Sequence, residues 1–328
     1  MGPSSRFHSD KLHGLTSLDD ARAAAARVGD RVNRTALVPA PALSARLDAE
    51  VWLKRELDQP TGSFKVRGVF NAVLSLPEED LRRGLAAFSA GNHAAAVAHV
   101  GATLGVPVTV CMPAAAEPRK IAATRALGAE VVLVETDLVG TSQRLVAERG
   151  LTLVHPFDHP AIVAGHATAG LEIAADLPDV DLVVVPVGGG GLISGVAAAV
   201  RQSVPTSRVV GVEPEGADVV SRSLAAGEPV VQAGPKSIAD GLTAPITGAV
   251  PFEHIRSFVD TVVRVPDEAI LDALGILLRE EGVPAEPAGA AGLAALLSKA
   301  VPVTPGQRVV LVISGGNVDP DLLARLAD

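Results

Sequence analysis

The sequence is poor in cysteine, in excess positive charge and in long apolar runs. Its single cysteine, Cys111, excludes an intrachain disulfide and is typical of a reducing compartment, so we expect a cytoplasmic protein. The net charge of −9 argues against nucleic acid or an anionic membrane as the main partner. No apolar stretch is long enough to cross a bilayer, and the N-terminus lacks the apolar segment of a signal peptide. We therefore expect a globular protein that acts on a small molecule.

Lysine is also scarce: the chain has six, at positions 11, 54, 65, 120, 236 and 299. Only Lys65 follows a turn signal, at residues 59–62, and has mostly small and apolar neighbours. A lysine held away from water loses basicity and becomes a nucleophilic amine that can form a Schiff base. The alternative is a lysine at a helix start whose tip reaches solvent, and the segment 61–68 alone favours that alternative.

Strands and helices are predicted to alternate along most of the 328 residues. Strands are expected at 51–56, 85–88, 106–112, 130–134, 181–187, 208–213, 262–265 and 308–313. Helices are expected at 17–28, 66–76, 94–104, 119–127, 139–149, 161–176, 192–203, 267–281 and 288–300, whereas 214–258 is predicted to be irregular. This pattern is typical of an α/β protein with two open, mainly parallel twisted sheets flanked by helices. We expect a large domain of residues 1–82 plus 159–328 and a small domain of residues 83–158, with a cleft between them.

The segment 188–191 consists of four successive glycines between a predicted strand and a predicted helix. Without side chains the backbone can approach an anion closely, and the helix N-terminus favours phosphate. Neither the spacing of a dinucleotide-binding fingerprint nor the Gly-Lys pair of a P-loop is present. The loop therefore predicts a phosphate site without a nucleotide signature, the alternative being a tight structural turn.

Two further loops follow apolar strands. Residues 89–93 offer hydroxyl, amide and imidazole groups at a helix start, which suits a substrate carboxylate, although His93 alone reads more readily as a structural histidine. Residues 314–317 place the hydroxyl of Ser314 at the edge of the cleft, and they are equally compatible with a purely structural turn. An activated lysine, a phosphate site and a carboxylate site together suit pyridoxal phosphate chemistry on an amino acid.

The sequence resembles the fold-type II pyridoxal-phosphate enzymes, which share a fold with the tryptophan synthase β chain, and among them the serine/threonine dehydratase group that includes serine racemase. The matching segments are TGSFKVRG (61–68), SAGNHAA (89–95), PVGGGGL (186–192), VEPEGA (212–217), IADGL (238–242), EPAGAAGLAAL (286–296) and SGGN (314–317). They span most of the chain in the order typical of the family.

The resemblance implies a role for each matched loop. Lys65 would carry the cofactor covalently and, once freed by the substrate, take the α-proton; Asn92 would contact the ring hydroxyl and Ser314 the ring nitrogen. The residues implied at the cofactor are Phe64, Lys65, Asn92, Gly188, Gly189, Gly190, Gly191, Leu192, Glu286 and Ser314. The residues implied at the substrate are Ser89, Ala90, Gly91, Asn92 and His93.

The implied reaction is β-elimination of L-threonine, L-serine or a related β-hydroxy amino acid to a 2-oxo acid and ammonia. β-Replacement, as in cysteine or threonine synthases, is the first alternative, and a catalytically silent amino-acid-binding protein is the second. Racemisation is disfavoured because Ala90 stands where serine racemases carry a second serine that moves a proton.

Other departures bear on a metal and on regulation. Glu213 and Ala217 match the family's divalent-cation site, but Val219 stands at its third position and Asp218 lies one residue early, so we predict no metal. The segment 165–168 also differs from the usual glutamine-glycine-threonine, which leaves substrate preference open. The chain ends eleven residues after Asn317, so we expect no C-terminal regulatory domain and no feedback by isoleucine. The resemblance further implies a homodimer.

Overall fold

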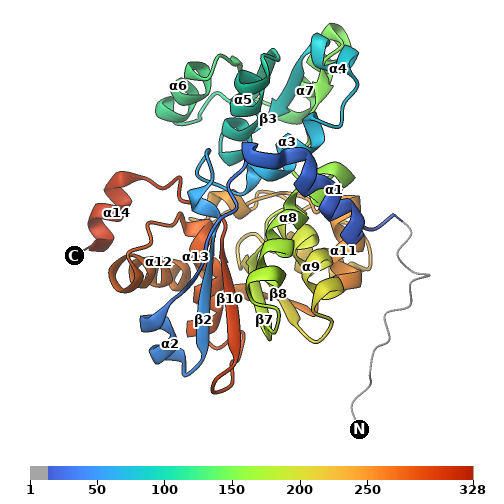
Figure 1. Cartoon of the computed structure of the whole chain (residues 1–328). Coiled ribbons are helices and arrows are strands. Elements are labelled where there is room, and N and C mark those ends of the chain that lie inside the picture. Colours follow the sequence, from blue (N-terminus) through green and yellow to red (C-terminus); the bar gives the residue numbers. More distant parts are fainter. Residues whose placement is uncertain (1–13, 328) are drawn as a thin grey trace.

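The computed structural model describes residues 14–327 and contains two open sheets with helices around them (Figure 1). The N-terminal segment that was predicted to lack a signal peptide lies outside these residues. In the view of Figure 1 the smaller sheet and its helices form the upper part and the larger sheet the lower part, with α3 (Lys65–Val73) between them. The prediction of an α/β fold with two mainly parallel sheets is therefore confirmed.

The larger sheet has six strands in the order β1-β2-β10-β7-β8-β9. They are β1 (Leu37–Pro39), β2 (Glu50–Arg55), β7 (Leu182–Pro186), β8 (Arg208–Pro214), β9 (Thr261–Val265) and β10 (Arg308–Ile313). All neighbours are parallel except β1 and β2, which pair antiparallel. The sheet is thus assembled from both ends of the sequence, because β2 lies beside β10.

Helices cover both faces of this sheet, and its central strands are accordingly apolar on both sides. On β10, Val309 and Leu311 enter the core formed with α2 (Pro41–Leu47), α12 (Asp267–Glu281) and α13 (Pro287–Leu297). Val310 and Val312 enter the opposite core, formed with α8 (Pro160–Asp176) and α9 (Gly191–Ser203). The only tryptophan, Trp52 on β2, packs against this second core.

The smaller sheet has four parallel strands in the order β5-β4-β3-β6. They are β3 (Leu85–Phe88), β4 (Val108–Pro113), β5 (Glu130–Val134) and β6 (Thr152–Leu153). Its helices are α4 (Glu78–Arg83), α5 (Asn92–Leu104), α6 (Pro118–Ala126) and α7 (Leu138–Arg149). Its core also takes in Val66, Val69 and Phe70 of α3, so this helix packs against the smaller sheet as well as against α8.

The capped helix predicted at 17–28 is confirmed as α1 (Leu18–Val28), with Ser17 and Asp20 forming a capping box. The prediction of an irregular segment over 214–258 is wrong, because it contains α10 (Val219–Ala226), a 3₁₀ turn (Asp240–Leu242) and α11 (Ala249–Phe258). The prolines and glycines there separate short helices rather than preventing them. The strand β6 and the helices α2, α4 and α14 (Pro320–Ala327) were not predicted.

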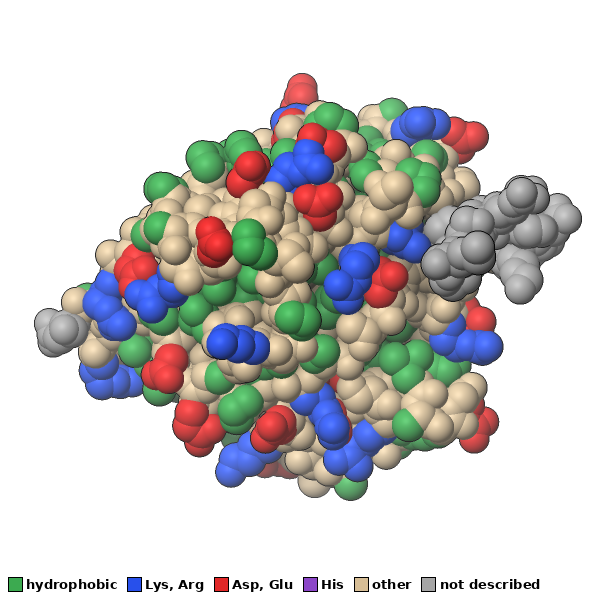
Figure 2. All heavy atoms as spheres, turned by 90° about the horizontal axis from the view of Figure 1, so that it is seen from below, with side chains coloured by type: hydrophobic (Ala, Val, Ile, Leu, Met, Phe, Trp, Pro, Cys, Tyr) green, Lys and Arg blue, Asp and Glu red, His purple; other side chains and the backbone are tan. Residues whose placement is uncertain are grey.

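No helix within residues 14–327 is both long and apolar enough to cross a bilayer. On the face seen in Figure 2, acidic and basic side chains are interspersed, so neither sign of charge dominates that face. This mixture agrees with a chain whose excess of acidic residues is modest for its length.

A buried group of charges fixes α3 against the larger sheet. Arg67 and Glu56 are fully buried, and the guanidinium donates two bonds to the Glu56 carboxylate, at 2.7 and 2.8 Å. Arg67 also donates two bonds to Glu172 of α8, at 2.7 and 2.8 Å, and Lys54 of β2 pairs with the same carboxylate. Burial acts to raise the pKa of Glu56, but the adjacent Arg67 outweighs it and holds that pKa below its usual value. The group is therefore a charged network in which each ion has a partner.

Replacing Arg67 by methionine should lower the free energy of unfolding by about 3–5 kcal/mol, because it leaves buried carboxylates without their partner. The measurement is urea unfolding followed by circular dichroism. Arg82→Met is the matched control, because its pair with Glu78 has side chains 69% and 81% exposed and should contribute less than about 1 kcal/mol. Equal losses in the two variants would contradict a stabilising role for the buried network.

Candidate active site

A cavity of about 870 Å³ lies where the loops of the two sheets meet. The loops after β3, β7 and β10 all line it, as does the first residue of α3. The sequence-predicted site residues that line it are Phe64, Lys65, Ser89, Ala90, Gly91, Asn92, His93, Gly188, Gly189, Gly190, Gly191, Leu192, Glu286 and Ser314. The structure thus brings all of them together, although their individual roles stay predictions.

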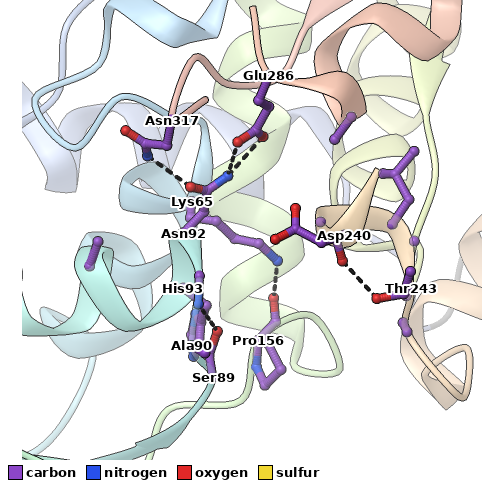
Figure 3. Close-up of a pocket in the computed structure, with 18 of the residues that line it drawn as sticks. Lys65, Ser89, Ala90, Asn92, His93, Pro156, Asp240, Thr243, Glu286 and Asn317 are labelled. Atoms are coloured by element: carbon purple, nitrogen blue, oxygen red, sulfur yellow. Dashed lines mark hydrogen bonds between the residues drawn. The ribbon is translucent and has the colours of Figure 1, made fainter. Parts of the chain in front are cut away.

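Lys65 is the first residue of α3, and its amine points into the cavity (Figure 3). Its Nζ donates a hydrogen bond of 2.8 Å to the carbonyl oxygen of Pro156 and lies 5.0 Å from the ring centre of Phe64. Burial lowers the pKa of Lys65 to about 8, while the carboxylate of Glu286 acts in the opposite direction. Lys65 is half-buried, and its amine is directed into the cavity rather than to the outer surface of the molecule. An amine with this pKa is partly neutral near pH 7 and can act as a nucleophile or base.

The glycine segment 188–191 joins β7 to α9 and approaches its neighbours so closely that side chains do not fit. A methyl group added at Gly189 would lie 2.4 Å from Cδ1 of Phe157. Gly190 has a φ of 92°, which only glycine adopts readily, and no side chain caps the helix that follows it. The N-terminal amides of α9 therefore face a cavity with room for an anion.

The side chains of Asn92, Glu286 and Asn317 converge near Lys65 (Figure 3). Asn92 Nδ2 donates to both carboxylate oxygens of Glu286, at 2.8 and 3.0 Å. Burial raises the pKa of Glu286 to about 7, and the bonds from Asn92 counteract that rise. Glu286 lies at the start of α13 and Asn92 at the start of α5, so this contact links the two sheets.

The loop at 89–91 precedes α5, and no side chain caps this helix either. Ser89 Oγ accepts a hydrogen bond of 3.1 Å from the amide of Gly91. His93 is buried, and its Nε2 lies 2.8 Å from the carbonyl oxygen of Val154. Burial lowers the pKa of His93 to about 3, so its ring is neutral and one ring nitrogen is held by the smaller sheet. This geometry favours the structural interpretation of His93, although the residue also lines the cavity.

Ion pairs connect α6 to the turn at 240–242 and to the residue before α14, and the sequence analysis missed them. Lys120 Nζ lies 3.2 Å from a carboxylate oxygen of Asp240, and Arg119 lies 3.5 Å from one of Asp319. Phe157, which packs on the glycine segment, was also missed. Lys120 and Asp240 had a signal, since lysine is scarce and Asp240 lies in the matched segment 238–242, whereas Phe157 had none.

His166, where the sequence departs from the family pattern, does not line the cavity. Its ring contacts the ring of Phe64 edge-on with 4.8 Å between centroids, and it occupies the space beside Gly68. Burial lowers the pKa of His166 well below the usual value, so the ring is neutral. His166 therefore packs against the first turn of α3 from outside the cavity.

At the segment that corresponds to the family's cation site, the carboxylates of Glu213 and Asp218 form hydrogen bonds and ion pairs with other groups of the protein. Glu213 accepts hydrogen bonds from the amides of Val220 and Ser221, at 2.7 and 2.9 Å, and from the Ser221 hydroxyl at 2.7 Å. Burial raises the pKa of Glu213 to about 7. Asp218 forms ion pairs with Arg222 and Arg264 instead of joining Glu213. Among the described residues, no group of three or more histidine, cysteine, aspartate or glutamate side chains is placed to hold a metal ion.

Residues 28–315 match the model of a family described as "Pyridoxal-phosphate dependent enzyme". The chain is 42% identical over 315 residues to the L-threonine ammonia-lyase of Thermotoga maritima, covering 95% of this chain and 78% of that protein. Its fold is similar to that of the T.th. threonine deaminase, with a TM-score of 0.87 and 39% identity, over 93% of this chain and 99% of the other. It is also similar to maize serine racemase, with a TM-score of 0.90 and 34% identity, over 95% and 96% of the two chains.

The family match extends over every strand of both sheets and over the cavity loops up to residue 315. The matches agree with a cavity lined by both a lysine amine and the glycine segment. The chain therefore belongs to the pyridoxal-phosphate dependent enzymes, in the fold-type II threonine/serine dehydratase group.

Proposed function

We propose that this protein is a lyase that converts L-threonine, L-serine or a related β-hydroxy amino acid to a 2-oxo acid and ammonia by β-elimination. The observation that carries this proposal is the amine of Lys65, which lies in a cavity bounded by the glycine segment and by the loop 89–92. The relatives named as threonine ammonia-lyase and threonine deaminase support the same reaction. The balanced outcome for threonine is 2-oxobutanoate plus ammonia.

The residues present fit pyridoxal phosphate as the cofactor. The glycine segment leaves a backbone surface that a single methyl group would obstruct, and the uncapped N-terminus of α9 favours a phosphate there. Phe64, Asn92, Glu286 and Ser314 would surround the remainder of the cofactor. When bound, pyridoxal phosphate supplies an aldehyde that joins amines and a ring that withdraws electrons from the substrate's α-carbon.

Lys65 would hold the cofactor and then act as the base. Burial lowers the pKa of Lys65 to about 8, so part of its free amine is neutral near pH 7, and a neutral amine there could accept the α-proton of the substrate. The uncapped start of α5, with Ser89 and Gly91, would bind the substrate carboxylate and so orient the α-hydrogen toward Lys65. The proton that Lys65 takes could then pass to the β-hydroxyl, which would leave as water, and the released enamine would take up water to give the 2-oxo acid and ammonia.

Ala90 separates this reaction from racemisation, the activity named for the maize structure. Racemisation requires a second proton donor on the opposite side of the α-carbon, and a methyl group cannot supply a proton. Elimination needs no proton donor on that side, because the proton that Lys65 takes from the α-carbon can leave with the β-hydroxyl, so the alanine favours elimination. β-Replacement would need a second substrate in the same cavity, and no contact described above favours one.

We also propose that the chain divides into a small domain of residues 83–158 and a large domain formed by the rest. All four strands of the smaller sheet lie between Leu85 and Leu153, which supports this division.

We further propose that the protein is a cytoplasmic homodimer. The buried, unpaired Cys111 is compatible with a reducing compartment, and the dimer rests on the family resemblance alone.

The proposed reaction is tested by incubating the purified, cofactor-loaded protein with a panel of β-hydroxy amino acids. We expect release of a 2-oxo acid and ammonia in equal amounts from L-threonine or L-serine. Lys65→Ala should lose both the yellow colour and the activity, whereas Lys299→Ala, on the surface, should keep both. A yellow protein that releases no 2-oxo acid from any member of the panel would disprove the lyase.

The lowered pKa of Lys65 predicts how fast cofactor-free protein takes up pyridoxal phosphate. Between pH 7 and pH 9 the neutral fraction of an amine with a pKa of about 8 rises from about one tenth to about nine tenths. Covalent uptake, followed by absorbance, should therefore rise and then level off near pH 9. N-acetyl-lysine amide is the control and should still be accelerating at about pH 10, because an ordinary lysine has a pKa of about 10.4. A protein curve that matches the control would contradict the lowered pKa.

Ala90 predicts the stereochemical outcome. With L-serine the native protein should form 2-oxo acid without appreciable D-serine, as measured by chiral chromatography. Ala90→Ser adds the missing hydroxyl and should raise the ratio of D-serine to 2-oxo acid, whereas Ala90→Gly should not. Appreciable D-serine from the native protein would refute the role given to this position.

A further inference from the structure

Asn317 makes contacts that join the site loops of both sheets, although no role has been assigned to it so far. Its Nδ2 donates one hydrogen bond to the carbonyl oxygen of Thr61, at 2.9 Å, and another to Oδ1 of Asn92, at 2.8 Å. Thr61 belongs to the turn before Lys65, and Asn92 begins α5 of the smaller sheet. Figure 3 shows Asn317 and Glu286 on either side of the Asn92 amide.

These contacts fix the orientation of the Asn92 amide. Its nitrogen end donates to the Glu286 carboxylate, and its oxygen end accepts from Asn317. Turning the amide over would place the oxygen of Asn92 against a carboxylate and its NH₂ group against another NH₂ group. Both contacts would then be unfavourable, because one would place two acceptors together and the other two donors. Asn317 and Glu286 together therefore permit one orientation.

Asn317 is itself held by the backbone around it. The amide of Gly316 donates to the carbonyl oxygen of Gly62 at 2.9 Å. The amide of Phe64 donates to the carbonyl oxygen of Ser314 at 3.0 Å. Gly62 has a φ of 70°, and a methyl group added there would lie 2.5 Å from Oδ1 of Asn317. The loop after β10 is thus laid along the segment that leads into Lys65, and the glycine makes room for the asparagine.

We propose that Asn317 is a positioning residue that orients Asn92 toward the cofactor and ties the smaller sheet to the turn preceding Lys65. The Asn92 amide is hydrogen-bonded to Glu286 through its nitrogen and to Asn317 through its oxygen. The orientation of this amide in the cavity is therefore determined by residues outside α5. This inference rests on the cofactor assignment made under the proposed function, but not on the identity of the substrate.

The test uses Asn317→Asp, which keeps the shape of the side chain and removes both N–H donors. Cofactor-free protein is titrated with pyridoxal phosphate, and its dissociation constant and the absorption maximum of the bound form are recorded. We expect roughly fivefold to tenfold weaker binding, as for the loss of one or two hydrogen bonds, together with a shifted absorption maximum. With L-threonine, kcat should fall more than KM changes.

Asn317→Ala removes the donor without adding a charge and should show the same weaker binding and shifted absorption maximum. Arg325→Ala, exposed on α14 of the same terminal segment, is the control and should behave as the native protein. If Asn317→Ala does not fold, Asn317→Asp decides. A native dissociation constant and absorption maximum in Asn317→Asp would overturn the proposal, even if its melting temperature were lower. Because these readouts need no substrate, they remain informative if no amino acid proves to be a substrate.

Discussion

The bidentate contacts of Arg67 with two carboxylates are the constraint on which the site depends. Arg67 lies two residues after Lys65 in the same helix. The ion pairs that hold Arg67 in place therefore also fix the direction in which Lys65 leaves the helix. Glu56 belongs to the turn after β2 and Glu172 to α8, so the arginine is anchored to two elements of the larger unit. A buried ion pair has little tolerance for displacement, because a charge that loses its partner remains without water. Lys65 therefore stands on a helix with very little freedom to move.

Around that helix, the two sheets contribute their loops at the same place. The strands β3, β7 and β10 all end at the cavity, as expected for parallel sheets, whose ligands bind beyond the carboxyl ends of the strands. The uncapped N-termini of α5 and α9 then present backbone amides to it from different sheets. One suits a carboxylate and the other a phosphate, which matches an amino acid held beside its cofactor.

The sequence predicted the parts of this arrangement that depend on local patterns. Apolar strands, the glycine segment and the position of Lys65 after a turn are all visible within a dozen residues. The hydrogen bond between Asn317 and Asn92 joins residues 225 positions apart in the chain, and the contact of Phe157 with Gly189 depends on how separate segments pack. No local propensity encodes such contacts. The helices α10 and α11 were missed for another reason: they are only eight and ten residues long, and they lie in a stretch rich in proline and glycine.

The single tryptophan has an optical consequence. Trp52 lies in β2 of the larger sheet, and the sequence contains no tyrosine, so the intrinsic emission of the chain reports from one sheet. The smaller sheet has its own core, which Trp52 does not join. Melting of the smaller sheet alone would leave that emission nearly unchanged while reducing the helical ellipticity contributed by α5 and α7. The two signals together distinguish stepwise from concerted loss of structure in a chain with separate cores.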